Sequence, residues 1–380
     1  MNTLDGLPRF LHTADWQIGR QYASFAPDDA VALAEARISV IERIADLATQ
    51  HAVDAVLVAG DVFDAQTVSD RTIRRLFNAM ADYAGPWILI PGNHDAALAE
   101  SVWTRAQRLG AVPESAHLAL SPQVLEFAEA GFAILPAPLT QRHTQSDLTS
   151  WFDQAETAEG LARIGLAHGS VQGILAEDVD SPNPIAADRT ERSRLDYLAL
   201  GDWHGTKQIN PRTWYSGTPE QDRFRGNDPG NVLLVDTPEV GAEPRVEILP
   251  IGRHPWIQMS EHLAVSSDLD QLIANIEAQP EQAVVALRLE GEISLLGKQQ
   301  LERALSVAEA RFRSLGYDLS GLSLQPTEDD IAALHADGYV GDVIAELRDQ
   351  QEGEGGEVAR DAMAILASML LEKQAQGGDA

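Results

Sequence analysis

The sequence contains no cysteine among its 380 residues. Disulfide bonds and thiolate catalysis are therefore excluded, and a reducing cytosol is compatible with the chain. The sequence also lacks an apolar run of membrane-spanning length, and its first twenty residues lack the basic and apolar segments of a secretory signal. We therefore expect a soluble cytoplasmic protein with no membrane partner.

Basic residues are also scarce. The chain has 28 Lys and Arg against 58 Asp and Glu, a formal net charge of -30. Such a protein is not expected to bind nucleic acid over its whole surface, because phosphate binding needs local positive potential. The stretch 188–225 differs, since it holds seven basic and six acidic residues. These counts fit a confined basic patch and ordinary loops of mixed charge equally well.

Short runs rich in Val, Ile and Leu alternate with stretches of helical periodicity from residue 8 to about 250. This alternation predicts an α/β domain with largely buried strands. A crossover helix is expected over 30–50. The expected strands are 9–13, 55–59, 87–90, 132–136, 164–167, 197–200, 232–235 and 246–249.

The texture of the sequence changes after residue 250. Residues 251–326 predict a small α+β domain, with strands at 256–265, 283–289 and 318–324 and helices at 267–277 and 297–315. Residues 327–380 contain a break, "QEGEGGEV", and then the stretch 358–373, where Met363, Leu366, Met369 and Leu370 recur at helical spacing. This apolar face would pack either on the chain itself or on a partner's helix. We therefore divide the chain into 1–250, 251–326 and 327–380.

Five short motifs follow the expected strands. A strand-end Asp alone is often only a helix cap, and a lone His is often structural. Together, oxygen and imidazole ligands at one edge of a sheet suit a pair of divalent cations that clamp a phosphate and activate a water. The motifs are "DWQ" (15–17), "GDVFD" (60–64), "GNHD" (92–95), "AHGS" (167–170) and "GDWHG" (201–205).

In this order the motifs resemble those of the calcineurin-type metallophosphoesterases, whose fold is a four-layer α/β/β/α sandwich. "FLHTADW", "GDVFD" and "YSGTPEQDRF" (215–224) are most similar to the SbcD and meiotic-recombination nuclease branch, which acts on DNA ends with manganese. The resemblance covers roughly residues 9–250. It implies a DNA exonuclease and endonuclease in DNA repair, a homodimer, a capping domain at 251–326, and a helical segment at 327–380 that binds an SbcC-like SMC-family ABC ATPase.

The resemblance also implies roles for single residues. His94 would face the scissile phosphate, and Asp95 would either fix the tautomer of that histidine or cap a helix. Arg223 and Arg225 would contact the DNA backbone, although ordinary surface ion pairing is the alternative for both. One metal ion would be held by Asp15, Gln17, Asp61 and His204, and the second by Asp61, Asn93, His168 and Asp202. His12 is expected to be a buried strand residue.

Two positions depart from the family pattern. The family usually has histidine where this chain has Gln17, and "GHxH" where it has Asp202. A neutral amide oxygen binds transition metals more weakly than imidazole, so Gln17 is either a weak ligand or a hydrogen-bonding neighbour of the ligands. The added carboxylate makes the sites richer in oxygen, which favours two Mn²⁺ or Mg²⁺ ions over zinc.

Two other functions remain open at this stage. A phosphoesterase for a small phosphodiester or phosphomonoester fits the acidic balance better, but the "GTPEQDRF" segment and the C-terminal segments count against it. A scaffold subunit with a degraded metal site is suggested by Gln17. The survival of Asp61, Asn93, His94 and both other histidines of the motifs argues against such decay.

Overall fold

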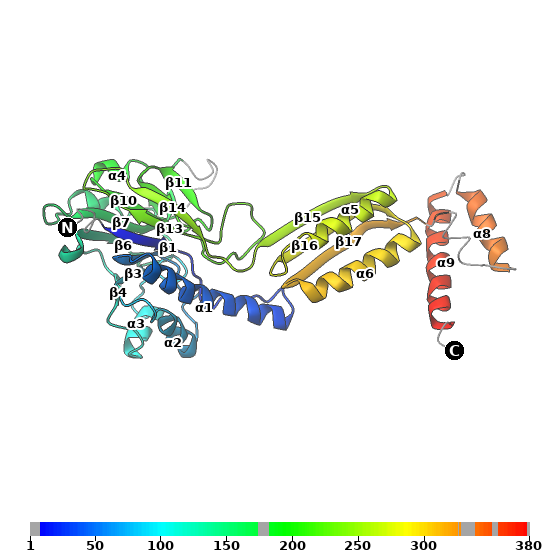
Figure 1. The fold of residues 1–380 in the computed structure, drawn as a ribbon, viewed down its shortest axis with the longest axis horizontal. Coiled ribbons are helices and arrows are strands. Elements are labelled where there is room, and N and C mark those ends of the chain that lie inside the picture. Colours follow the sequence, from blue (N-terminus) through cyan, green and yellow to red (C-terminus); the bar gives the residue numbers. More distant parts are fainter. Residues whose placement is uncertain (1–7, 174–181, 326, 328–338, 352–355, 378–380) are drawn as a thin grey trace. The chain divides into compact units, whose positions relative to one another are not determined.

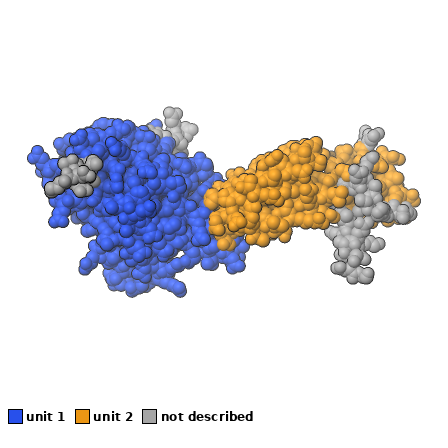
Figure 2. All heavy atoms as spheres, viewed as in Figure 1, with its two compact units in different colours: residues 1–254 blue, residues 255–380 orange. Residues whose placement is uncertain are grey.

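The computed structural model describes residues 8–173, 182–325, 327, 339–351 and 356–377. It divides the chain into two compact units, Met1–His254 and Pro255–Ala380 (Figure 2). The first unit ends soon after strand β14 (Arg245–Pro250), and the second begins just before β15 (Trp256–Leu263). Each unit has a buried apolar core of its own.

Two six-stranded sheets form the first unit (Figure 1). The first sheet has the order β14, β13 (Asn231–Asp236), β1 (Arg9–Thr13), β2 (Ala55–Ala59), β3 (Trp87–Ile90) and β4 (Ala116–Leu118). The second has the order β11 (Lys207–Asn210), β12 (Thr213–Tyr215), β10 (Tyr197–Gly201), β7 (Ala162–His168), β6 (Phe132–Ala137) and β5 (Leu125–Phe127). In both sheets the central strands are parallel.

Side chains of the central strands alternate between two apolar layers, because successive residues of a strand point to opposite faces. Phe10 and Leu57 belong to the layer between the two sheets, where the ring of Phe10 meets that of Phe132 edge-on at a centroid distance of 4.9 Å. Leu11 and Val56 face the other way, toward helices. The strands are thus buried on both faces, as their continuous apolar sequences predict.

Three helices cover the outer face of the first sheet: α1 (Pro27–Gln50), α2 (Asp70–Ala79) and α3 (Val102–Arg108) (Figure 1). Proline opens α1, and the side chains of Ser69 and Ser101 cap α2 and α3. Within the described residues, the outer face of the second sheet carries short pieces: η2 (Ser150–Asp153), the β8 (Ser170–Val171) and β9 (Pro184–Ile185) pair, and α4 (Arg189–Arg192). The predicted α/β/β/α sandwich is confirmed, and its fourth layer is thin.

The second unit is built on three parallel strands, β15, β16 (Val284–Ile293) and β17 (Ser314–Leu324). Helices α5 (Ser266–Glu277) and α6 (Leu295–Arg311) connect them and pack on the sheet (Figure 1). The elements follow the predicted order, but the α+β prediction is wrong in detail. Parallel strands joined by helices form βαβ units, and β17 begins where the sequence predicts helix.

Two helices end the described chain, α8 (Tyr339–Gln350) and α9 (Gly356–Gly377), and they pack on each other. The helix predicted at 358–373 lies within α9, and Met363 on its expected apolar face is buried. Met369 on the same face is 62% exposed, so packing on the chain covers only part of that face. Among the helices of the described residues, none has the length and apolar character that crossing a membrane requires.

His12 links the two sheets by hydrogen bonds in the layer between them. Its Nε2 lies 3.1 Å from the carbonyl oxygen of Leu200, so this nitrogen donates, and its Nδ1 accepts from the hydroxyl of Tyr197 at 2.9 Å. Burial lowers the pKa of His12 to about 3, so the ring is neutral at pH 7. The expectation of a buried strand residue is confirmed.

His12 should make the first unit sensitive to acid. Its pKa rises from about 3 in the folded chain toward 6.5 on unfolding, so the unfolded state binds more protons and stability falls below pH 6.5. Between pH 6.5 and 5 the loss should be about 2 kcal/mol, and His12→Gln should lack this part. Urea unfolding at both pH values measures it. Equal acid dependence of the two proteins would contradict the neutral, buried ring.

Candidate metal centre

Loops from both sheets meet at the carboxyl ends of the parallel strands. The backbone of the loop after β1 is bonded to the loop after β2, with Asp15 N donating to Gly60 O at 3.0 Å and Gln17 N donating to Asp61 O at 2.8 Å. Across the sheets, the amide of Asp202 lies 3.2 Å from both carboxylate oxygens of Asp15. These bonds fix the spacing of the side chains that the loops carry.

Four of the expected ligands have a left-handed backbone. Their φ angles are 55° for Asp15, 45° for Gln17, 51° for Asp61 and 100° for Asp202. Each such residue costs on the order of 1–3 kcal/mol and persists only where the surroundings force it, typically at functional sites. Gly92 makes room for them, since a Cβ there would overlap the carboxylate of Asp61.

His168 is the centre of one group of ligand atoms. Its Nδ1 donates to the carbonyl of Ala59 at 2.8 Å, so Nε2 is the nitrogen that faces the site. Nε2 lies 3.2 Å from Asn93 Oδ1 and 3.6 Å from the Oδ1 atoms of both Asp61 and Asp202. Atoms bound to one ion at about 2.2 Å are roughly 3.1–3.6 Å apart, so this donor set fits a divalent cation.

Negative charge is concentrated around this histidine. Ligand atoms of Asp15, Asp61 and His168, all buried, lie within 4.8 Å of one another. Burial raises the pKa of Asp15 to about 6, and the neighbouring Asp61 and Asp202 add to this effect. Burial opposes the charged form of His168, yet Asp61, Asp202 and Asp15 raise its pKa to about 9. A cation bound here would relieve this repulsion.

His94 lies at the edge of this group with a partly exposed side chain. Its Nδ1 is hydrogen-bonded to the Asp64 carbonyl at 2.8 Å, and its Nε2 is 3.9 Å from Asp61 Oδ2. The Asp95 carboxylate instead accepts from the amides of Gly92 at 2.6 Å and Phe63 at 3.0 Å. Asp64 therefore fixes the tautomer of His94, and Asp95 joins two of the loops.

Gln17 and His204 lie beside the group. Gln17 Nε2 is 3.2 Å from His204 Nε2, while Gln17 Oε1 accepts from Arg20 at 2.7 Å. His204 Nδ1 lies 3.2 Å from a carboxylate oxygen of Asp222. The structure thus brings all seven expected metal ligands to one edge, but Gln17 turns its oxygen toward an arginine.

Asp222 contacts the site, although the sequence motifs do not single it out as a site residue. Its side chain is 1% exposed and lies 2.9 Å from Arg223, 3.2 Å from Arg20 and 3.8 Å from Arg37. Burial opposes its charge, but His204, Arg223 and Arg37 hold its pKa well below the usual range. Its place in "GTPEQDRF" was the available signal. Arg223 is thereby paired, whereas the side chain of Arg225 is exposed.

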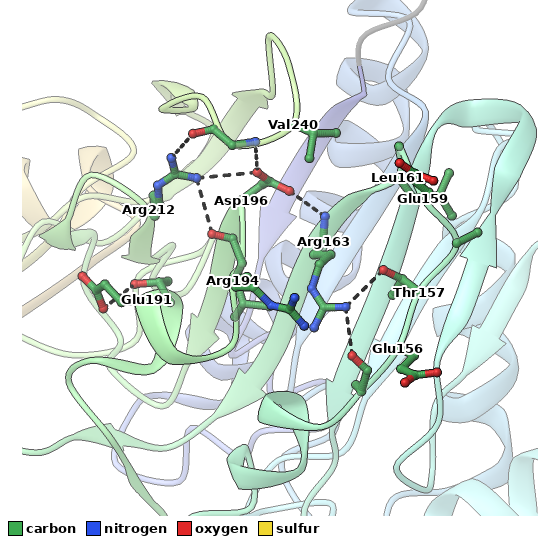
Figure 3. Close-up of a pocket in the computed structure, with 16 residues that line it drawn as sticks. Glu156, Thr157, Glu159, Leu161, Arg163, Glu191, Arg194, Asp196, Arg212 and Val240 are labelled. Atoms are coloured by element: carbon green, nitrogen blue, oxygen red, sulfur yellow. Dashed lines mark hydrogen bonds and ion pairs between the residues drawn. The ribbon is translucent and has the colours of Figure 1, made fainter.

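A cavity of about 730 Å³ lies elsewhere in the first unit, and none of the expected site residues lines it (Figure 3). Arg163 points into this region but donates to the carbonyl oxygens of Phe152, Ala155 and Ser193. Arg212 lies 3.6 Å from Asp196. Both arginines hold loops together, so this cavity takes no part in the metal centre.

The part of the chain that carries this site matches a known protein family. The family described as calcineurin-like phosphoesterase matches residues 8–235, which include every expected ligand. The chain belongs to this family. Its members are phosphoesterases that use divalent metals, and the His168 group is the part of this member that suits such an ion.

Several relatives are similar to this family member. The SbcD subunit of the nuclease SbcCD from Escherichia coli K12 is 33% identical over 56% of this chain and 60% of the relative, and the protein of the same name in Rhodobacter capsulatus is 39% identical over 23% and 22%. "Uncharacterized metallophosphoesterase YhaO" of Bacillus subtilis is 25% identical over 60% and 56%. The chain therefore spans less than two thirds of the length of these relatives. The solved structure of TT1561 from Thermus thermophilus matches 64% of this chain and 99% of its own, with a TM-score of 0.41 and 12% identity.

Removing the charge of Asp222 should destabilise the first unit. In Asp222→Asn the buried guanidinium of Arg37 and its neighbours lose their anion, so the free energy of unfolding should fall by about 3 kcal/mol. The control is Asp236→Asn, which breaks a half-exposed pair with Arg9 and should cost less than about 1 kcal/mol. Urea unfolding compares the two. Equal losses would show that Asp222 is an ordinary surface partner.

Proposed function

We propose that the chain is a metal-dependent phosphodiesterase that cleaves DNA at or near its ends in DNA repair. The observation that carries the proposal is the group of Asn93, Asp61 and Asp202 around the Nε2 atom of His168, at distances that suit a divalent ion. The choice of DNA as substrate is supported by two relatives that carry the name of the SbcCD nuclease. The proposed metal is Mn²⁺, because the donors are mostly oxygen atoms.

A bound divalent cation would polarise the phosphate and lower the pKa of a coordinated water. The chain's own contribution is to orient the reacting groups. The amide of His94 donates to Asp61 Oδ1 at 2.9 Å and fixes that carboxylate. Because the Asp64 carbonyl accepts from Nδ1 of His94, the Nε2 atom is left on the side of Asp61 Oδ2, 3.9 Å away, where an Nε2–H group could donate to a phosphate or leaving oxygen.

The assigned roles of Asp61 and His94 predict that Mn²⁺ binding and the rate of DNA cleavage can be changed separately. Asp61→Ala should abolish both Mn²⁺ binding and cleavage. His94→Gln should retain Mn²⁺ binding but lower kcat by about 10²–10⁴-fold, since it removes proton transfer. Cleavage of end-labelled duplex and hairpin DNA with Mn²⁺ or Mg²⁺, and Mn²⁺ binding by calorimetry, give the two readouts.

The exposed His143 provides a matched control. His143→Gln should leave cleavage and metal binding unchanged. Cleavage by Asp61→Ala at the wild-type rate would contradict the proposed centre. An unchanged kcat in His94→Gln would remove His94 from the reaction and leave the metal ligands in place.

A phosphoesterase for small substrates is the second candidate. The net charge of -30 favours it, because DNA binding needs positive surface. It is also favoured because Arg20, Arg37 and Arg223 near the site are already paired with Asp222. Of the two arginines proposed to contact DNA, Arg223 is paired and Arg225 is exposed. Rates on an aryl phosphodiester and on hairpin DNA separate the two candidates. A scaffold subunit would bind less than one ion per chain and show no hydrolysis that depends on Asp61.

The proposed partner is an SbcC-like SMC-family ATPase, which would supply the positive DNA-binding surface that this acidic chain has little of. We assign the contact to residues 327–380 and treat residues 251–326 as the proposed capping domain. Large apolar side chains are exposed on the C-terminal helices, with Tyr339 at 81%, Val358 at 72% and Ile365 at 62%. A homodimer is proposed on the family resemblance alone.

Disrupting α9 should release the partner. The double variant Ile365→Asp, Met369→Asp should lose pulldown of the ATPase, because both side chains are exposed and charge opposes apolar contact. Removal of the residues after Pro326 should have the same effect and leave Mn²⁺ binding intact. Val307→Asp is the control, since Val307 on α6 is exposed to a similar degree, 70% against 62% for Ile365 and Met369. Unchanged pulldown with the truncated chain would reject this assignment.

A further inference from the structure

The orientation of the Gln17 amide is set by a neighbour three residues along the chain. Arg20 Nη1 lies 2.7 Å from Gln17 Oε1. A guanidinium only donates hydrogen bonds, so the amide must present its oxygen to Arg20. The amide NH₂ therefore faces His204, whose Nε2 is 3.2 Å away. Gln17 directs a donor, and not its ligand oxygen, toward the metal centre.

Arg20 itself is held in place. Its Nη1 also lies 3.2 Å from the buried carboxylate of Asp222 and 3.7 Å from Asp64, and its guanidinium lies over the ring of Tyr22. Turning the amide of Gln17 to offer its oxygen to an ion would bring NH₂ against this guanidinium, donor against donor. The present orientation is thus fixed from outside the site.

His204 is engaged by the same arrangement. The NH₂ of Gln17 faces Nε2, while Nδ1 lies 3.2 Å from Asp222 and 2.9 Å from Nη2 of Arg223, so neighbouring residues engage both ring nitrogens. The Nε2 atom that would bind an ion is therefore already in contact with the Gln17 amide. Two of the four ligands expected for the first ion bond to each other, and the permanent positive charge of Arg20 opposes a cation beside them.

Within the described part of the chain, the ligands expected for the other ion, around His168, have no arginine beside them and no amide turned the wrong way. The three oxygen atoms around His168 Nε2 belong to Asn93, Asp61 and Asp202, at 3.2–3.6 Å. Among the described residues, the ion pairs of Asp61 and Asp202 are with histidines alone. An ion can therefore enter this position without displacing a fixed cation.

We propose that the centre binds one divalent ion tightly, among His168, Asn93, Asp61 and Asp202, and that the chain Arg20–Gln17–His204 replaces the second ion. The inference rests on the proposed metal centre and changes its stoichiometry. Arg20 supplies positive charge beside the position of the lost ion, and the second N–H of the Gln17 amide supplies a donor for a phosphate oxygen. Only the remaining ion depends on His168.

Mn²⁺ titration of the full chain, followed by calorimetry and electron paramagnetic resonance, tests the inference. The wild-type protein should bind one tight ion with the hyperfine spectrum of isolated Mn²⁺. The double variant Gln17→His, Arg20→Ala should bind two ions and show the spectrum of an exchange-coupled pair. His168→Ala should lose the tight ion. Gln21→His changes an exposed glutamine of the same loop, so it is the matched control and should still bind one Mn²⁺ ion.

The possible failures are distinguishable. Two tight, coupled ions in the wild-type protein would overturn the single-ion inference and leave the metal centre standing. Absence of any tight ion would overturn the metal centre itself. A double variant that is folded by circular dichroism and still binds one ion would show that Gln17 and Arg20 are not the cause, and would also overturn the inference.

Discussion

The parallel pairing of β1 with β2 continues beyond the ends of both strands, and the site depends on it. Asp15, Gln17 and Ile18 donate in turn to Gly60, Asp61 and Val62, although the chain must turn left-handed at four of these positions. The hydrogen bonds offset the strain, and the strain points the carboxylates to the same side. Ligands from the second sheet then approach a preformed edge.

Sequence patterns predicted the positions of the strands better than the hydrogen bonds and ion pairs between side chains. β1, β2 and β3 begin and end at the predicted residues; the apolar runs of β2 and β3 stop at Gly60 and Pro91, which interrupt a strand. The parallel sheet of the second unit was missed, since strand direction depends on packing between distant segments. Motif order alone grouped the ligands, but the orientation of Gln17 depends on Asp222, some two hundred residues away, and no local pattern contains that information.

Charge is divided sharply at this edge of the fold. Carboxylates surround His168, where a cation would be stabilised, while arginines gather around Asp222 a short distance away. The same acidic chain thus places a cluster of carboxylates next to arginines that are already paired with Asp222. Net charge describes neither position, because burial and pairing set the local potential.

The hydrogen bonds of His12 have a mechanical consequence. They tie β1 of one sheet to β10 of the other, and these two strands lead directly to Asp15 and Asp202. The ring thus acts as a spacer between the loops of the two sheets that carry Asp15 and Asp202. Ionic radius selection by this centre would then be governed from within the apolar layer, by how closely the two sheets pack.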